Sequence, residues 1–240
     1  MTKLLSTRSR RTEALTRDQI VDAAIALLDA GGEAALTFRT LSERLATGPG
    51  ALYGHIANKR DLVAAACDTV VGRTVDVQAG DATPQDTVRN VALALFDAMD
   101  AHQWVGAALT WSAGQLTMVR VVERIGQQVV ALGVPDAARW AAVSALLNYI
   151  FGVGGQNAGN AQMARARGAN RTEMLDTVAS AWSQLDPQAY PFVHSVAEQM
   201  RVHDDRVDFL VGIDLMLAGL AQQGGARGIE PRAVIESHGD

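Results

Sequence analysis

Apolar residues recur along this chain three and four positions apart, the spacing that places side chains on one face of an α-helix. Between residues 16 and 77 this pattern predicts four helices, which begin near Thr16, Thr37, Pro49 and Asn58. The strict alternation of apolar and polar residues that marks a half-buried strand does not occur in the sequence. The pattern therefore predicts an all-α fold.

Polar residues, glycines and a proline mark the ends of these first helices. Thr16 and Gln19 have the spacing of a capping box, in which each side chain accepts a hydrogen bond from the other residue's backbone N–H. Gly31-Gly32 is expected to end that helix, and Ala46-Thr47 to form the turn before the third helix. Pro49 suits a first helical position because the N–H that it lacks would have no partner there.

The helical pattern continues through the rest of the chain. Further helices are predicted at residues 84–101, 104–112, 115–132, 136–158, 170–185, from 187 onward, and 204–223. Residues 159–170 are rich in Gly, Ala, Asn and Arg and are interpreted as a mobile loop. The predicted organisation is a disordered basic arm at 1–15, a small helical domain at 16–77, a linker at 78–83, a larger helical domain at 84–223 and a flexible tail at 224–240.

The composition favours packed helices in a reducing compartment. The chain has 240 residues, is 48% hydrophobic and only 5% aromatic, and contains one cysteine, Cys67. A disulfide within one chain is therefore impossible. The first residues are polar and basic, without the apolar core of a signal peptide. Apolar runs long enough to span a membrane are also absent from the sequence, so we expect a soluble cytoplasmic protein without a membrane partner.

Charge is distributed unevenly along the chain. The formal net charge is −5, which taken alone argues against a nucleic-acid partner. However, residues 1–64 carry nine Lys or Arg and seven Asp or Glu, whereas residues 65–240 carry twelve and nineteen. Attraction to phosphate is local, so a basic N-terminal region on an acidic body remains compatible with DNA binding. An ordinary solvated tail would have the same charge.

Residues 37–61 have the pattern of two short helices joined by a tight turn, which is how many proteins place a helix in the DNA major groove. Leu52 and Ile56 are expected to face the core. Arg39 and Lys59 flank the second helix and suit phosphate contacts. The residues left facing outward are Pro49, Gly50, Ala51, Tyr53, Gly54 and His55. The alternative is a small helical domain with a surface Tyr and His.

The segment LATGPGALYGHIANKRDLV, and residues 16–70 around it, resemble the DNA-binding domain of the tetracycline-repressor (TetR) family of transcription regulators. The resemblance implies an N-terminal three-helix helix-turn-helix domain. It also implies that operator DNA is contacted by Pro49, Gly50, Ala51, Tyr53 and His55, with Thr37, Arg39 and Lys59 on the DNA backbone. Gly54 departs from many members, which have a larger or basic residue there, so one contact is expected to be missing.

The rest of the chain resembles the branch of this family that contains the tetracycline repressor itself, through His102-Gln103-Trp104 and residues 209–220. This resemblance implies a ligand-binding and dimerisation domain. The helices at 136–158 and 204–223 are apolar on two faces, which predicts a four-helix interface in a homodimer. The residues assigned to that interface are Trp140, Val143, Leu147, Phe209, Gly212, Ile213, Met216, Gly219 and Leu220. A monomer that buries both faces is the alternative.

A small-molecule cavity needs aromatic walls and a few polar groups. The residues that we assign to such a cavity are Trp104, Trp111, Gln115, Met118, Asn148, Phe151, Gln156 and Asn157. Each of them alone is equally compatible with an ordinary core position. Some relatives bind a metal-chelated ligand through pocket histidines, and His102 is the position here that matches such a role.

Enzymatic chemistry has little support in the sequence. The five histidines lack the paired spacing of a metal site, and His203-Asp204-Asp205 is more typical of a helix cap. No cofactor and no metal are expected. We therefore predict a non-enzymatic, ligand-responsive DNA-binding regulator, a repressor released from a palindromic operator by a small molecule. The alternatives are a TetR-like activator and a helical small-molecule-binding protein or enzyme without specific DNA binding.

Overall fold

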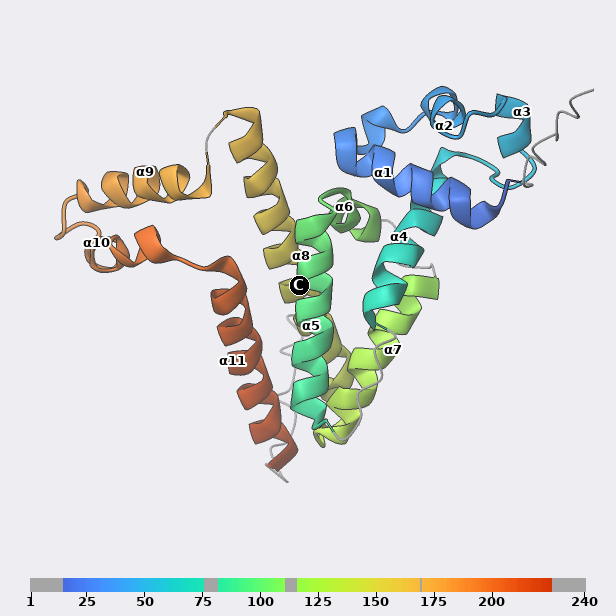
Figure 1. The fold of residues 1–240 in the computed structure, drawn as a ribbon. Coiled ribbons are helices and arrows are strands. Elements are labelled where there is room, and N and C mark those ends of the chain that lie inside the picture. Colours follow the sequence, from blue (N-terminus) through green and yellow to red (C-terminus); the bar gives the residue numbers. More distant parts are fainter. Residues whose placement is uncertain (1–14, 76–81, 111–115, 169, 226–240) are drawn as a thin grey trace, which may run out of the picture. The chain divides into compact units, whose positions relative to one another are not determined.

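The computed structural model describes residues 15–75, 82–110, 116–168 and 170–225, and every regular element in these ranges is a helix (Figure 1). The chain divides into two compact units, residues 1–69 and residues 70–240. The all-α prediction is thus confirmed for the described part of the chain. The predicted arm, linker and tail fall almost entirely outside the described residues.

The first unit contains α1 (Arg17–Ala35), α2 (Phe38–Arg44), α3 (Pro49–Leu52) and the first part of α4 (Lys59–Val75). The predicted capping box at Thr16 is confirmed, because its side chain accepts from the backbone N–H of Gln19. The two glycines interrupt the first helix as predicted, since both have non-helical dihedral angles, and a short helical segment beyond this kink extends α1 to Ala35. Gly32 has a φ of +62°, the left-handed conformation that glycine adopts without steric cost.

Large apolar side chains from all four helices form the core of this unit. Those that are at most 2% exposed are Ile20 and Leu28 of α1, Leu36 directly after α1, Leu41 of α2, Leu52 of α3, Ile56 in the following turn, and Leu62 and Val63 of α4. Asn58 caps α4, since its side-chain oxygen accepts from the backbone N–H of Asp61 at 2.9 Å. The core therefore holds α2 and α3 rigidly through their inner faces.

Cys67 lies on α4 and belongs to this core, where it is 2% exposed. Burial, with a smaller effect of Asp68, raises the pKa of its thiol from 9.0 to about 12. Because only the thiolate reacts, we expect Ellman's reagent at pH 8 to modify the folded protein about 1000-fold more slowly than the urea-unfolded chain. The absorbance of the released thiol measures this. Equal rates in both states would show that Cys67 is accessible.

In the second unit α5 (Pro84–Ala101) packs against α7 (Leu116–Ala131), α8 (Asp136–Ala166) and α11 (Asp205–Gly225), with α6 (Trp104–Thr110) beside α5 and α8 (Figure 1). Phe96 of α5 stacks on Phe209 of α11, with ring centroids 4.7 Å apart. Phe209 in turn stacks on Tyr149 of α8 at 5.6 Å. This row of three rings joins the helices at the centre of the unit.

The predicted loop at residues 159–170 is wrong over most of its length. Helix α8 continues through residue 166, and a turn at Gly168, with a φ of +65°, ends it. Ala158 and Ala164 are 3% and 6% exposed, so this part of α8 is held by packing. Burial of alanine thus outweighs the low helix propensity of the nearby Gly and Asn residues.

Residues 171–203 form an excursion of three short helices between α8 and α11: α9 (Arg171–Ser183), α10 (Pro191–Val196) and a 3₁₀ helix, η1 (Gln199–Val202). The start predicted at Asp186-Pro187 is a turn instead, in which Asp186 accepts from the backbone N–H of Gln188 at 2.9 Å. The helix itself begins at Pro191. A polar side chain that satisfies its own turn has displaced the helix start by about one turn.

The two ends of this excursion meet beside the start of α11. Arg171 donates to the carbonyl oxygen of His203 at 3.0 Å and pairs with Asp205 at 2.7 Å. His203 lies between Asp205, at 2.9 Å, and Asp208, at 2.7 Å. Asp204 accepts from two backbone N–H groups at the start of α11, so the cap predicted here is confirmed.

Two kinds of feature are absent from the described residues. Their histidine, cysteine and acidic side chains form no group of three that could hold a metal ion. None of their helices combines the length and the apolar character that crossing a membrane requires.

Candidate nucleic-acid interface and surfaces of the larger unit

The two-helix motif at residues 37–61 is built by local hydrogen bonds. Thr37 caps α2 by accepting from the N–H of Thr40 at 3.1 Å, while the Thr40 hydroxyl donates to the carbonyl of Ala35 at 2.8 Å. Ala46, with a φ of +49°, turns the chain after α2. The backbone N–H of Thr47 closes the turn by donating to the carbonyl oxygen of Ser42 at 3.0 Å. The motif therefore consists of two short helices joined by a tight turn, as predicted.

The second of these helices is shorter than predicted. Helix α3 begins at Pro49 and ends at Leu52, so Tyr53 follows as its C-terminal cap with helical dihedral angles. His55 lies in the next turn, where its N–H donates to Leu52 at 2.9 Å. The low helix propensity of Gly54 accounts for this early end.

The outward face of the motif consists mostly of small residues. Leu52 and Ile56 are buried, and all six residues predicted to face outward, Pro49, Gly50, Ala51, Tyr53, Gly54 and His55, are exposed. A Cβ atom added at Gly50 or Gly54 would meet no atom within 4 Å. Backbone and small side chains are thus open to close approach by a large partner such as a DNA groove.

Three further residues of the predicted interface flank this face. Thr37 and Arg39 are exposed, and Arg39 pairs with Glu43 at 3.0 Å across one turn of α2. Lys59 is half-buried, and its ammonium group donates to the carbonyl oxygen of Glu33 at the end of α1. A groove of about 420 Å³ is lined by Arg39 and Glu43 of α2 and by Gly48 and Pro49 at the start of α3.

One residue of this site was missed by sequence reasoning. The ring of Phe38 stacks on that of Tyr53, with centroids 4.9 Å apart and planes 13° from parallel. Phe38 is the first residue of α2 and Tyr53 directly follows α3, and only the tertiary fold brings them together. The sequence signal available in advance was the aromatic residue directly after the cap Thr37, a position half-buried in the structure.

In the larger unit, the residues predicted to form a dimer interface fall into two groups. Val143, Leu147, Phe209 and Ile213 are buried within the subunit. Trp140 and Gly219 are exposed, and Met216 and Leu220 are half-buried. Gly212 lies directly under the phenol ring of Tyr149, so it serves the contact of α11 with α8 inside the subunit.

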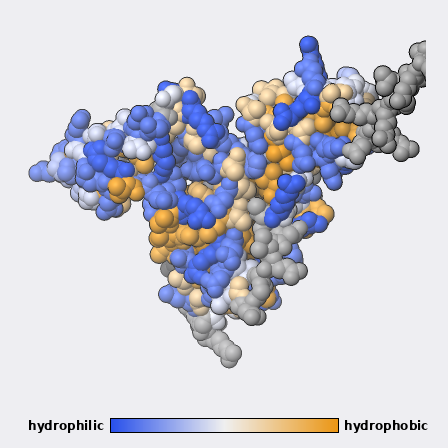
Figure 2. Space-filling view, viewed as in Figure 1, coloured by the Kyte–Doolittle hydropathy of each residue, from blue (hydrophilic) through white to orange (hydrophobic). Residues whose placement is uncertain are grey.

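Helices α8 and α11 nevertheless retain outward apolar faces. Figure 2 shows apolar side chains on the surface of the larger unit, along α11. The outward residues, here called the α8/α11 face, are Ala141, Ala145 and Gly152 of α8 with Val207, Val211, Leu215 and Ala218 of α11. Val207, Val211 and Leu215 are 55%, 52% and 71% exposed, and exposed apolar residues that recur along one helix are more informative than a single one. The residues of the α8/α11 face are thus exposed, whereas Val143, Leu147, Phe209 and Ile213 are not.

The residues predicted to line a ligand cavity have different environments within the described part of the chain. Trp104 and Met118 are buried, Phe151 is half-buried, and Asn148 and Gln156 lie exposed on α8. Two others make contacts within the unit: Asn157 donates to Asp100 at 2.8 Å, and the ring of His102 lies 6.1 Å from that of Trp104. Trp111 and Gln115 lie outside the described residues.

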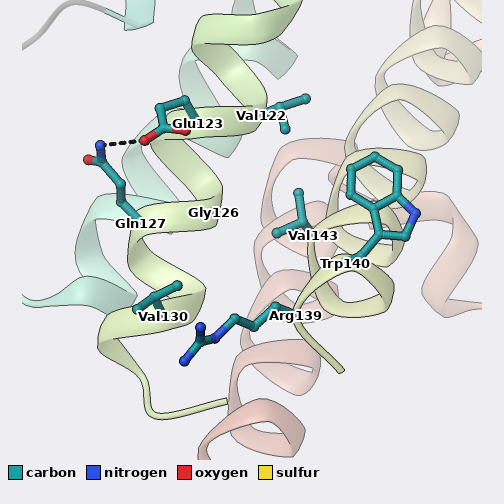
Figure 3. A pocket seen from close by; sticks show the side chains of 8 residues that line it. All are labelled: Val122, Glu123, Gly126, Gln127, Val130, Arg139, Trp140 and Val143. Carbon is teal, nitrogen blue, oxygen red and sulfur yellow. Dashed lines mark hydrogen bonds between the residues drawn. The ribbon is translucent and has the colours of Figure 1, made fainter. Parts of the chain in front are cut away.

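A groove of about 450 Å³ between α7 and α8 was not anticipated (Figure 3). Val122, Gly126 and Val130 line it from α7, and Val143 with the exposed ring of Trp140 lines it from α8. At its end Arg139 is held by Asp136 at 2.6 Å and by the carbonyl of Val134 at 3.1 Å. The sequence feature that could have predicted this groove is a second row of apolar residues on α7, at every fourth position, beside the row that faces the core.

Comparison with known proteins finds a matching family for each of the two units. Residues 20–66 match the family described as bacterial regulatory proteins, tetR family. Residues 78–223 match the tetracyclin repressor-like C-terminal domain. A curated HTH-type transcriptional regulator from Saccharopolyspora erythraea is 32% identical over 148 residues, which are 60% of this chain and 62% of the relative. The chain thus spans about three fifths of that relative's length.

Solved structures show the same fold. The transcriptional regulator SCO7222, a TetR from Streptomyces coelicolor, is 49% identical, with a TM-score of 0.79 over 88% of this chain and 99% of that one. BioQ from Mycobacterium smegmatis is 26% identical, with a TM-score of 0.62 over 87% and 99% of the two chains. The structure of BioQ with its natural double-stranded DNA operator is also 26% identical, with a TM-score of 0.59 over 86% of this chain and 98% of that one. From the capped helix-turn-helix to the end of α11, the chain belongs to the TetR family of bacterial regulatory proteins.

Proposed function

We propose that this protein is a transcriptional repressor that binds double-stranded operator DNA through α3 and the turn after it. The observation that carries the proposal is the rigid α2–turn–α3 motif, whose exposed surface consists of small residues with Tyr53 and His55 at one end. Arg39 and Lys59 lie beside it, where they suit phosphate contacts. The operator complex of BioQ supports duplex DNA as the partner.

The proposed active form is a homodimer joined through the α8/α11 face. A helix with an apolar face on each side needs two partners, and the inner faces of both helices are already filled by the subunit's own core. Two copies of α8 and α11 then form a four-helix interface across a two-fold axis. Such a dimer reads two half-sites about 34–36 Å apart.

The larger unit is proposed to bind a small-molecule effector that releases the DNA. An effector acts by favouring a dimer in which the two α3 segments no longer match the operator spacing, and a coupling free energy of about 1–3 kcal/mol changes operator affinity roughly 5- to 150-fold. We propose no catalytic role and no cofactor. A protein with this role works in the cytoplasm, where the chromosome is.

Selection of genomic DNA fragments by the purified protein tests this function. We expect enrichment of one near-palindromic sequence with half-sites one helical turn apart, and binding that weakens steeply as salt increases. The genes beside the enriched site then indicate the effector. Recovery of no common sequence would contradict the proposal and favour a small-molecule-binding protein without specific DNA recognition. Transcription measured with and without the protein distinguishes repression from activation.

A further inference from the structure

The stacked pair formed by Phe38 and Tyr53 lies at the edge of the exposed α3 surface. Their ring planes are 13° from parallel, with centroids 4.9 Å apart. Tyr53 itself is 63% exposed. The ring projects from the residue directly after a four-residue helix, and the stack with Phe38 is its aromatic contact.

The backbone of Phe38 is held in place by local hydrogen bonds. Phe38 is the first residue of α2, directly after Thr37, whose capping box with Thr40 sets the start of the helix. Its carbonyl oxygen also accepts from the hydroxyl of Ser42 at 2.7 Å, and Ser42 is 4% exposed. Three local hydrogen-bonding groups therefore hold the backbone of Phe38, and with it the base of the ring.

The side chain of Tyr53 is mostly exposed. Its backbone is held, because it follows the last residue of α3 and the backbone N–H groups of His55 and Ile56 both donate to the carbonyl of Leu52. Within the described residues, its hydroxyl has no hydrogen-bond partner. The stack with Phe38 lowers the rotational freedom of the ring while leaving the hydroxyl open to a ligand.

We infer that Phe38 is a positioning residue for operator binding: it orients the ring of Tyr53 so that the hydroxyl donates to a phosphate oxygen of the DNA. This inference rests on the proposed function. A side chain already ordered in the free protein loses less conformational entropy when it binds. Phe38 thereby acts on DNA through Tyr53, without a DNA contact of its own.

A double-mutant cycle on operator affinity tests this role, with wild type, Phe38→Leu, Tyr53→Phe and the double variant. Aromatic pairing of this kind corresponds to a change in affinity of about 3- to 10-fold, which is the loss we expect for Phe38→Leu. In the Tyr53→Phe background, which lacks the hydroxyl, Phe38→Leu should change affinity by less than about 2-fold. Phe38→Tyr keeps a flat ring and should restore wild-type affinity.

Two measurements separate positioning from general damage to the fold. Because the proposed contact involves a neutral hydroxyl, the slope of log affinity against log salt should be the same in Phe38→Leu and wild type. The aromatic proton resonances of Tyr53 in the free protein should lose their ring-current shift in Phe38→Leu and keep it in Phe38→Tyr. A lower melting temperature together with a changed salt slope would show a structural role and overturn the inference.

The outcomes also distinguish this inference from the proposed function. If wild type selects no operator, the proposed function fails, and the positioning role falls with it. If wild type binds an operator and Phe38→Leu binds equally well, the proposed function stands and the positioning role alone is refuted. Equal losses from Phe38→Leu in the two backgrounds would also refute it, because Phe38 would then act independently of the Tyr53 hydroxyl.

Discussion

Replacing Ala51 by glutamate is expected to weaken operator binding by at least about 100-fold, because like charges placed together at an interface cost several kcal/mol. Ala51 is exposed on α3 between Gly50 and the buried Leu52, so the new carboxylate would face the DNA without disturbing the core. Measurement of operator affinity by fluorescence anisotropy, at several salt concentrations, gives the size of the effect.

Ala51→Gln is the matched control, since glutamine has the shape and helix propensity of glutamate but no charge. We expect Ala51→Gln to lose much less affinity, and the gap between the two variants to narrow as salt rises. Both variants should melt at the wild-type temperature. Operator affinity that is unchanged in Ala51→Glu would place the DNA-binding surface elsewhere on the protein.

Gly212→Ala is expected to lower the free energy of unfolding by about 1–3 kcal/mol, the usual cost of overpacking a filled core. A Cβ atom at this position would collide with the phenol group of Tyr149. Tyr149 cannot move away freely, because its ring stacks on Phe209 at 5.6 Å and its hydroxyl donates to the carbonyl of Phe209 at 3.2 Å. Urea unfolding followed by circular dichroism measures the loss.

Gly159→Ala provides the comparison within the same unit. Gly159 is an exposed glycine of α8, and a Cβ atom there would meet nothing within 4 Å. Alanine is the better helix former by about 1 kcal/mol, so this variant should be neutral or more stable than wild type. If both variants changed stability alike, the close approach of α8 and α11 at Gly212 would not be a structural requirement.

Features that depend on residues three or four positions apart were predictable from the sequence. The capping box at Thr16, the helix starts at Thr37 and Asn58 and the turn at Ala46 were all found where the sequence placed them. Each is a hydrogen bond or a dihedral preference within one short segment. The inward positions of Leu52 and Ile56 followed from the same periodicity.

Features that depend on how whole helices are rotated and paired were not predictable in this way. Phe209 and Ile213 were assigned to a dimer interface, yet they form the subunit's core, while Leu215 faces outward. A helix that is apolar on two sides carries no local signal of which side meets its own subunit. That choice is made by the neighbouring helices, here α5 and α8, through the ring stack at Phe209.

The sequence by itself determined the helix starts at Thr16, Thr37 and Asn58, the DNA-binding motif and the family of this protein, because caps, turns and periodicity act over a few residues. Only the tertiary structure decided the length of α8, the α8/α11 face and the pairing of Phe38 with Tyr53. Each of these depends on burial between segments distant in the chain. The free energy of such burial is a property of the packed partners, and no single segment contains it.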